Sequence, residues 1–291
     1  MDNYTLTNDE ITVVIASKGA ELQRLYSNQT QLEYLWNGDP AFWGKKSPVL
    51  FPIVGGLKEN TFYYNEKSYQ LNRHGFARDM EFEVIYQDAT SISFLLEADE
   101  TTRKNYPFQF EFFVYYELLD NTVVVSYFVK NTDEKDILFS VGAHPAFALP
   151  LVAETEFSDY YLLFNKNEQT GHYPLAANGL IETKATPLLN NTNKLPLTKS
   201  LFYNDAIIFK SLQSNRISIV SDKTEHGLTM LFDNFPYMGI WSSKDANFIC
   251  LEPWCGVADN IDTNQQLINK EGINILPPKK TFSRTWGVRL F

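Results

Sequence analysis

Two histidines and one glutamate stand where an apolar run gives way to a turn. His144 precedes Pro145, His74 precedes a glycine, and Glu252 precedes Pro253. Proline ends a strand and biases the residue before it toward extended geometry, so such side chains are held at the rim of a sheet. Two imidazoles and a carboxylate form a set that can move protons on a bound molecule. The alternative is that each histidine is a structural turn residue bonded to backbone, and the local sequence leaves both interpretations open.

The net charge of the chain argues against two classes of partner. The 291 residues carry a formal net charge of −10, and their lysines and arginines are scattered. Nucleic acids and anionic membranes both require clustered positive charge. We therefore expect neither as a partner.

The cysteines and the start of the chain indicate the compartment. Cys250 and Cys255 are too few for a disulfide framework, and their spacing lacks the second pair or the nearby histidines of a zinc site. We predict no metal site. The polar segment 1–5 does not resemble a signal peptide, and no apolar run is long enough to cross a membrane. The sequence predicts a cytoplasmic, soluble protein.

Alternating apolar residues predict a fold made of strands. The clearest are 81–86, 91–96, 110–118 and 122–129, which predict a four-stranded antiparallel meander because side chains two apart share a sheet face. Further strands are expected at 11–15, 21–25, 137–141, 206–210, 216–220, 228–232, 239–242, 248–251 and 280–290. Helical turns are expected only at 99–105 and 263–269.

Two stretches lack this alternation. Residues 36–61 contain several prolines and glycines and the aromatic residues Trp36, Phe42 and Trp43, which favours a loop packed over a sheet. Residues 165–200 are rich in Asn, Thr and Pro, which indicates a lid, a binding loop or a chain of short edge strands. No linker or repeat divides the chain. We predict an all-β protein, one domain over residues 1–291, built as a large antiparallel β-sandwich with little helix.

A large sandwich with aromatic residues near polar turns suggests a carbohydrate cleft. Tyrosine and tryptophan rings stack against the C–H face of a sugar, and polar side chains bond its hydroxyls. Trp241 and Trp254 are the candidates for such a platform. The competing interpretation places each of them in the apolar core.

Three motifs carry a resemblance to a known family. The order HGFAR (74–78), GAHPAF (142–147) and LEPW (251–254), preceded by LFPIVG (50–55), resembles the aldose 1-epimerase (galactose mutarotase) family and its LacX-like branch over nearly the whole chain. The resemblance implies a galactose mutarotase-like supersandwich that interconverts the α and β anomers of a free aldose. Such chemistry moves only protons, so no metal, nucleotide or other cofactor is implied.

The resemblance also implies roles for individual residues. Glu252 would be the base that removes the proton from the C1 hydroxyl, and His144 the acid that protonates the ring oxygen. His74 would bond the ring oxygen or a neighbouring hydroxyl. Asp205 matches the family's sugar-binding aspartate, by a looser alignment. No role is predicted for the remaining histidines, His172 and His226.

One position departs from the family. Its members carry an arginine beside the position of Gly55, where this chain continues with Gly56 and Leu57 and then Lys58. Lys58, Arg73 or Arg78 would have to replace that arginine, and a lysine cannot copy the planar guanidinium fork. Arg78 could equally be a structural partner of a nearby carboxylate.

Two other functions stay open at this point. An enzyme acting on hexose 6-phosphates would need Arg73, Arg78 and Lys58 to converge at one end of the cleft. A non-catalytic sugar-binding protein could use the same fold. The presence of an acid–base set argues against the second, and the single carboxylate of this kind argues against a glycosidase. The sequence indicates a small sugar as partner and leaves the particular aldose and the oligomeric state undetermined.

Overall fold

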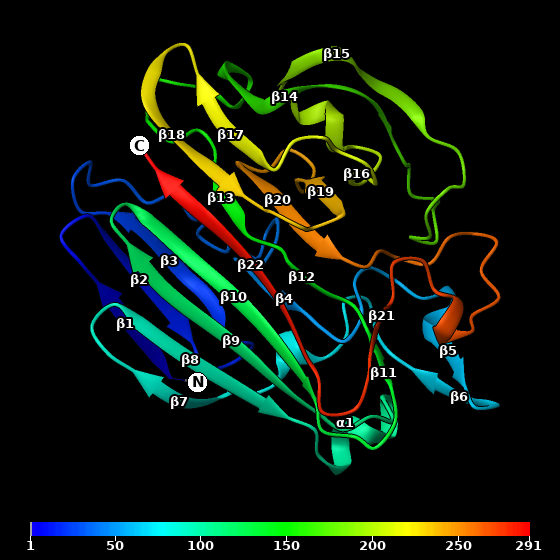
Figure 1. Cartoon of the computed structure of the whole chain (residues 1–291). Helices are drawn as coiled ribbons and strands as arrows, with labels where there is room; N and C mark the ends of the chain where they lie inside the picture. Colours follow the sequence, from blue (N-terminus) through cyan, green and yellow to red (C-terminus); the bar gives the residue numbers. More distant parts are fainter. Residues whose placement is uncertain (1) are drawn as a thin grey trace.

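A computed structural model describes residues 2–291, and its largest element is a nine-stranded sheet, antiparallel at every pairing (Figure 1). Its strands, in order across the sheet, are β15 (Thr186–Pro196), β14 (Tyr160–His172), β17 (Arg216–Ser221), β18 (Thr224–Leu231), β22 (Thr281–Leu290), β10 (Thr122–Asn131), β9 (Phe110–Leu119), β8 (Ser91–Glu97) and β7 (Glu83–Gln87). The last four are the predicted meander, which is confirmed.

A second, six-stranded sheet carries most of the candidate site. Its strands are β16 (Ile207–Phe209), β19 (Tyr237–Trp241), β20 (Phe248–Cys255), β12 (Val141–Ala143) and β4 (Val49–Leu50), with β13 (Ala146–Ala148) pairing to β20. Smaller sheets are formed by β1 (Asn3–Thr7), β2 (Ile11–Ala16) and β3 (Glu21–Ser27), by β5 (Thr61–Tyr64) and β6 (Lys67–Gln70), and by β11 (Ile137–Phe139) and β21 (Asn274–Leu276).

Helix is scarce in the part of the chain that the structure describes. It consists of α1 (Glu100–Asn105) and the 3-10 turns η1 (Lys58–Asn60), η2 (Ala77–Asp79), η3 (Phe157–Asp159), η4 (Lys199–Phe202) and η5 (Leu267–Asn269). Asp99 caps α1 by accepting a bond from the backbone N–H of Thr102, as its place before the turn suggests. No helix within residues 2–291 is both long enough and apolar enough to span a membrane. The all-β prediction is confirmed, and the single domain stays a prediction.

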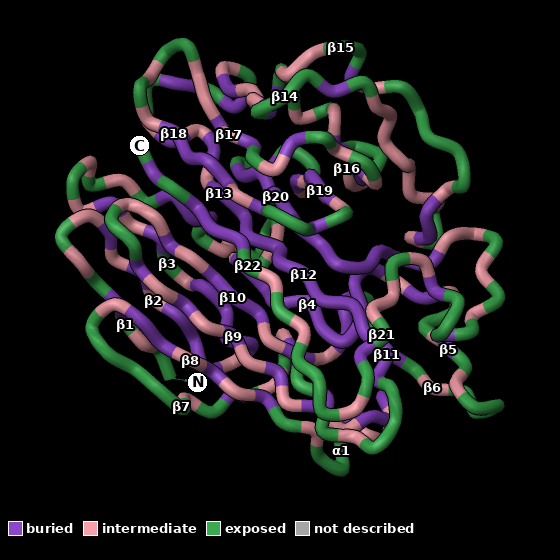
Figure 2. Tube along the Cα trace, in the orientation of Figure 1, coloured by how far each residue is buried: buried purple, intermediate pink, exposed green. Residues whose placement is uncertain are grey.

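One apolar core joins the sheets. On β9 every second side chain from Phe110 to Leu118 is buried, which is the period of a strand with one face inward. Apolar residues of the nine-stranded, six-stranded and three-stranded sheets belong to the same cluster of buried side chains. Figure 2 shows the buried positions concentrated in the central strands and the exposed ones in the surrounding loops. The site described below is therefore held by a rigid support.

For the segment 165–200, the alternative of edge strands is the one that forms, although as two long strands instead of several short ones. Most of this segment belongs to β14 and β15, which pair at the edge of the large sheet with three shifts of register. The polar, proline-containing sequence of 165–196 concealed the extent of these strands, because few of its side chains are buried in alternation. Pro187 and Pro196 both lie on the edge strand β15, where a missing N–H is tolerated.

The expected helix at 263–269 is also wrong, and only the short turn η5 forms there. The Thr263 hydroxyl accepts a bond from the backbone N–H of Gln265, and the Asn264 carbonyl oxygen accepts one from that of Gln266. Such local side-chain bonds compete with helix formation. Gln265 itself adopts a positive φ of 59°. The segment is a series of turns.

Candidate functional site

A cavity of about 300 Å³ opens on the six-stranded sheet and gathers most of the candidate residues. Its lining includes His74, His144, Glu252, Arg73, Arg78, Asp205 and Trp241, together with Trp43, Gly55, Leu175, Ala206, Ile208, Trp254 and Ala258. Segments far apart in the sequence thus supply one site. Lys58 is the one candidate that does not line the cavity.

Strand β20 places Glu252 on the cavity wall. Cys250, Glu252 and Trp254 share one face of the strand, because side chains two apart point the same way. Trp254 lies flat over the sheet, and Gly142 on β12 and Gly239 on β19 make room for it, since a Cβ at either position would clash with the indole. Gly142 has no positive φ, so its small size is what the site requires.

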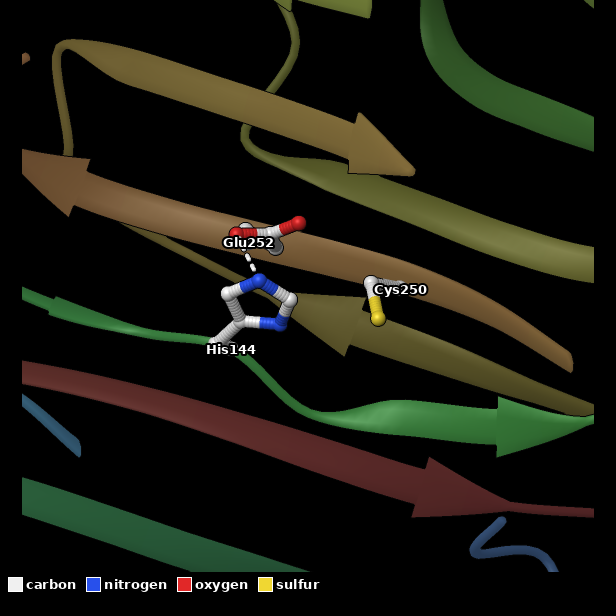
Figure 3. A group of neighbouring side chains, drawn as sticks. All are labelled: His144, Cys250 and Glu252. Carbon is white, nitrogen blue, oxygen red and sulfur yellow. Dashed lines mark ion pairs between the residues drawn. The ribbon is translucent and has the colours of Figure 1, made fainter. Parts of the chain in front are cut away.

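A break between two short strands places His144 opposite Glu252. Strands β12 and β13 both pair with β20, and His144 and Pro145 fill the gap between them. His144 Nε2 lies 3.2 Å from Glu252 Oε2, although the two atoms are not aligned as a hydrogen bond. The dashed line in Figure 3 marks this pair. The proline that ends the strand thus exposes the imidazole to the carboxylate. With Cys250 Sγ, these two residues place three potential metal donors within 4.8 Å of one another.

Hydrogen bonds from the backbone determine which ring nitrogen of His74 carries the proton. The backbone N–H of Gly55 donates to His74 Nδ1 at 3.1 Å, and the backbone N–H of His74 donates to the Gly55 carbonyl at 2.9 Å. Because Nδ1 accepts, the proton of the neutral ring sits on Nε2. His74 has a φ of 70°, a strained conformation for a histidine that is typical of functional sites.

Burial opposes charge on all three residues. Loss of solvation raises the pKa of Glu252 well above its usual value, and the nearby Arg73 only partly offsets this. Loss of solvation lowers the pKa of His144 to about 3, and it lowers that of His74 well below its usual value, where the neighbouring His144 adds to the effect. The site therefore favours a neutral carboxyl and a neutral imidazole over the corresponding ion pair.

Aromatic rings enclose His144 from the outside. The Trp43 ring lies 4.9 Å from the imidazole at an interplanar angle of 30°, and Trp241 meets it edge-on at 5.7 Å. His74 contacts the same imidazole edge-on, with centroids 5.5 Å apart. Trp43 and Trp241 thereby contribute to the desolvation of His144 and present ring surface to the cavity.

Charged groups line the more open part of the cavity. Arg73 Nη2 lies 4.0 Å from Asp205 Oδ2, and both side chains are about two-fifths exposed. Arg78 donates from Nη2 to the Arg73 carbonyl at 2.9 Å, while its buried Nε has no hydrogen-bond partner among residues 2–291. Burial lowers the pKa of Arg78. Arg73 and Arg78 are thus both available to a ligand, and Arg78 has a structural bond as well.

The sequence and the fold place the chain among known proteins. The sequence model of the family described as Aldose 1-epimerase matches residues 2–268. Two LacX proteins of Lactococcus lactis, one chromosomal and one plasmid-borne, are each 32% identical over 98% of this chain and 98% of their own length. The chain belongs to the aldose 1-epimerase family.

Comparison with solved structures supports the same assignment. A galactose mutarotase related enzyme from Lactobacillus acidophilus superposes with a TM-score of 0.95 at 37% identity, covering 100% of this chain and 97% of that one. A galactose mutarotase-like protein from Lactobacillus casei gives 0.92 at 30% identity, with both chains covered fully. The fold is therefore galactose mutarotase-like, as the three motifs predict.

The structure places two residues differently from what the sequence suggests: Lys58 does not line the cavity, and Trp43 does. Lys58 stays outside the cavity because its segment turns away after Gly56, and its backbone N–H is bound to the carboxylate of Asp259 at 3.0 Å. Of the three residues proposed to replace the family arginine, Arg73 and Arg78 line the cavity and Lys58 does not. Trp43 was missed as a site residue, although its place in a loop with two other aromatic residues was a usable signal.

A buried ion pair braces the loop that holds His74. Lys270 Nζ lies 2.8 Å from Asp259 Oδ1, with both side chains at most 3% exposed. The backbone N–H of Asp259 donates to the Gly56 carbonyl at 2.9 Å, so the pair is tied to the segment that bonds His74. The adjacent Ala258 packs so closely on Gly55 that no side chain fits there. The position of His74 thus depends on this pair.

Removing one partner of the brace should destabilise the protein strongly. Lys270→Met leaves the Asp259 carboxylate buried without its counter-ion, at a cost of about 3–5 kcal/mol in the free energy of unfolding. Urea titration measures this. Lys210→Met is the matched control, because the Lys210–Glu271 pair (2.7 Å) is more exposed, at 14% and 34%. Equal losses in the two variants would contradict the proposed brace.

Proposed function

We propose that the protein is an aldose 1-epimerase that interconverts the α and β anomers of a free aldose by opening and closing the sugar ring. The observation that carries the proposal is the buried pair of His144 and Glu252, 3.2 Å apart on the wall of the cavity. Ring opening needs one group to take the C1 hydroxyl proton and another to protonate the ring oxygen. A carboxylate and an imidazole in contact with one cavity supply both.

In the proposed mechanism Glu252 accepts the proton from the C1 hydroxyl while His144 donates one to the ring oxygen. The bond between C1 and the ring oxygen breaks and leaves an open aldehyde. Rotation about the C1–C2 bond presents the other face of the carbonyl carbon. His144 then removes the proton from the C5 hydroxyl as it attacks, and Glu252 returns a proton to the carbonyl oxygen. Every proton is returned, so the enzyme ends as it began.

These steps move the pair between two charge states. Ring opening starts from a carboxylate and an imidazolium and ends with a neutral carboxyl and a neutral imidazole. Burial favours the neutral pair, since it raises the pKa of Glu252 and lowers that of His144. The buried site therefore stabilises the bound open aldehyde relative to the bound ring. The neutral pair of the free enzyme holds as many protons as the carboxylate and imidazolium that start the reaction. A small rotation of the imidazole would let Glu252 pass its proton to Nε2.

His74 is proposed to bind the sugar rather than to exchange protons. Its Nε2–H is a fixed donor, because Nδ1 accepts the Gly55 N–H. With its pKa lowered by burial, the ring stays neutral during the reaction. It can therefore bond the ring oxygen or a hydroxyl without competing as an acid. Trp241 and Trp254 offer ring surface for the C–H face of the sugar.

Replacing either member of the pair should abolish most turnover. Glu252→Gln and His144→Asn keep polarity and approximate size but cannot exchange a proton, so each should lower kcat by at least about a hundredfold. Anomer exchange followed by NMR measures this after subtraction of spontaneous mutarotation. Glu271→Gln and His172→Asn are matched controls outside the cavity and should keep their turnover. Normal turnover in Glu252→Gln would favour a sugar-binding protein instead.

A donor at the position of His74 should be needed for both binding and turnover. His74→Asn is too short to place a donor where Nε2 lies, so KM should rise and kcat fall, each by about tenfold. His74→Gln reaches further with an amide N–H and should recover part of the loss. Anomer exchange at varied sugar concentration separates the two constants. A full loss of kcat with unchanged KM in His74→Asn would instead indicate an acid–base role.

A mutarotase of hexose 6-phosphates is the second candidate. Arg73 and Arg78 both line the cavity, and the buried Arg78 Nε has no hydrogen bond among residues 2–291, with the Asp79 carboxylate 3.8 Å away, which supports an anionic ligand. Against it, Asp205 lies 4.0 Å from Arg73 and Lys58 lies elsewhere. We therefore propose the unphosphorylated aldose as substrate. The cytoplasmic location stays a prediction.

Arg73→Gln separates the two candidates. If a hydroxyl is the partner of Arg73, kcat/KM should fall by about tenfold for a free aldose and by a similar factor for its 6-phosphate. NMR anomer exchange with both sugars gives the two ratios. A loss confined to the phosphorylated sugar, together with its preference by the unmodified enzyme, would establish the 6-phosphate as substrate.

A further inference from the structure

Cys250 has no part in the proposed reaction, yet it lies against the reacting pair. Its thiol is buried and free, and Sγ, a nitrogen of His144 and an oxygen of Glu252 all lie within 4.8 Å of one another. Figure 3 shows the three side chains close together, with the His144 ring below the carboxylate and the sulfur to its right. Cys250 does not line the cavity, so it contacts the pair from within the protein.

We propose that His144, Cys250 and Glu252 form a binding site for Zn²⁺, and that the bound ion inhibits the enzyme by competing with the sugar. An imidazole nitrogen, a thiolate and a carboxylate are the three ligand types that zinc takes in proteins. Mg²⁺ and Ca²⁺ prefer oxygen ligands alone and would not gain from the sulfur. The set is therefore selective for a borderline-soft divalent cation.

Charge balance favours zinc in this buried position. A thiolate and a carboxylate carry two negative charges, and the imidazole is a neutral ligand, so the complex with Zn²⁺ has no net charge. The thiol proton and any proton on the carboxyl leave to solvent as the ion binds. A buried charge is tolerated when it is paired, and a Zn²⁺ ion bound to both anionic ligands would pair each charge.

The donor atoms are already close to the required arrangement. His144 Nε2 and Glu252 Oε2 are 3.2 Å apart, near the spacing of about 3.3 Å expected for two ligands on one tetrahedral zinc. Glu252 Oε2 is buried and has no hydrogen-bond partner among residues 2–291. Rotation of the side chains would bring the sulfur into range without movement of β20, because Cys250 and Glu252 share its face.

The cavity explains both access and competition. His144 and Glu252 line the cavity, so an ion can reach them through it. These two residues would bind the ion on the side of the cavity, and Cys250 would bind it on the side of the protein interior. Three protein ligands leave a fourth position that faces the cavity. Because the proposed reaction places C1 of the sugar at the same pair, zinc and sugar exclude each other. This last step rests on the proposed function, whereas the binding of the ion does not.

Binding and inhibition should be tested on the whole chain, stripped of metal with a chelator and then dialysed. Titration with Co²⁺ as a spectroscopic probe should produce a thiolate-to-metal charge-transfer band in the near ultraviolet, and calorimetry with Zn²⁺ should show one site. Neither measurement needs catalysis. Zn²⁺ should raise the apparent KM for the aldose with no change in kcat, and Mg²⁺ at the same concentration should not.

Cys250→Ser and Cys255→Ser form a matched pair, because both cysteines are buried on β20 but only Cys250 is near His144. Cys250→Ser should keep the basal turnover, lose the charge-transfer band and weaken zinc inhibition by at least tenfold, whereas Cys255→Ser should retain both. Thermal unfolding checks that each variant is folded, and Cys250→Ala replaces Cys250→Ser if it is not. Equal zinc inhibition of the two variants, or a band that survives in Cys250→Ser, would overturn the site. A band without competition by sugar would overturn the inhibition alone.

Discussion

The exclusion of water from one carboxylate governs the chemistry of this site. Glu252 lies at the centre of the six-stranded sheet and is 1% exposed. Its charged form loses most of its solvation, and so does the charged form of the neighbouring His144. One proton can therefore move between the two groups with little help from solvent. In a solvated pair the ion pair would dominate, and the proposed neutral state that accompanies the open aldehyde would lose its advantage.

Strand β20 and its neighbours create that environment through the alternation of side chains between the two faces of the strand. The odd-numbered side chains Ile249 and Leu251 face the main core, while Cys250, Glu252 and Trp254 face the other way. Glycines on both neighbouring strands leave room for the Trp254 ring. The interruption between β12 and β13 then turns His144 toward the carboxylate. An insertion of one residue in β20 would exchange the two faces and remove Glu252 from the cavity.

Features of the fold and the site that depend on neighbouring residues in the sequence could be predicted from it, and features that depend on distant contacts could not. The meander at 81–129 shows in the alternation of Phe and Val because one face of each strand is buried. The outer half of β14 and the edge strand β15 could not be predicted so, since both of their faces carry polar residues, whereas the first half of β14, Tyr160 to Phe164, alternates and pairs with β17. The motifs identify His74, His144 and Glu252, but Trp43 joins them only through the packing of a long loop. The position of Lys58 outside the cavity has the same origin, because the direction of its segment is set by a bond from its backbone N–H to the distant Asp259 carboxylate.

The half-exposed side chains of Arg73 and Asp205 influence the protonation of the buried Glu252, and a bound sugar would change that influence. Arg73 lowers the pKa of Glu252 and Asp205 raises it, and the effect of Arg73 is the larger. Both side chains are about two-fifths exposed, so water now weakens their influence. A sugar that covers them would strengthen both effects, because the local dielectric falls. Of these two charges the larger effect is that of Arg73, which favours the carboxylate of Glu252, the form that must accept the C1 hydroxyl proton. Arg73 thus opposes the desolvation that keeps the resting pair neutral.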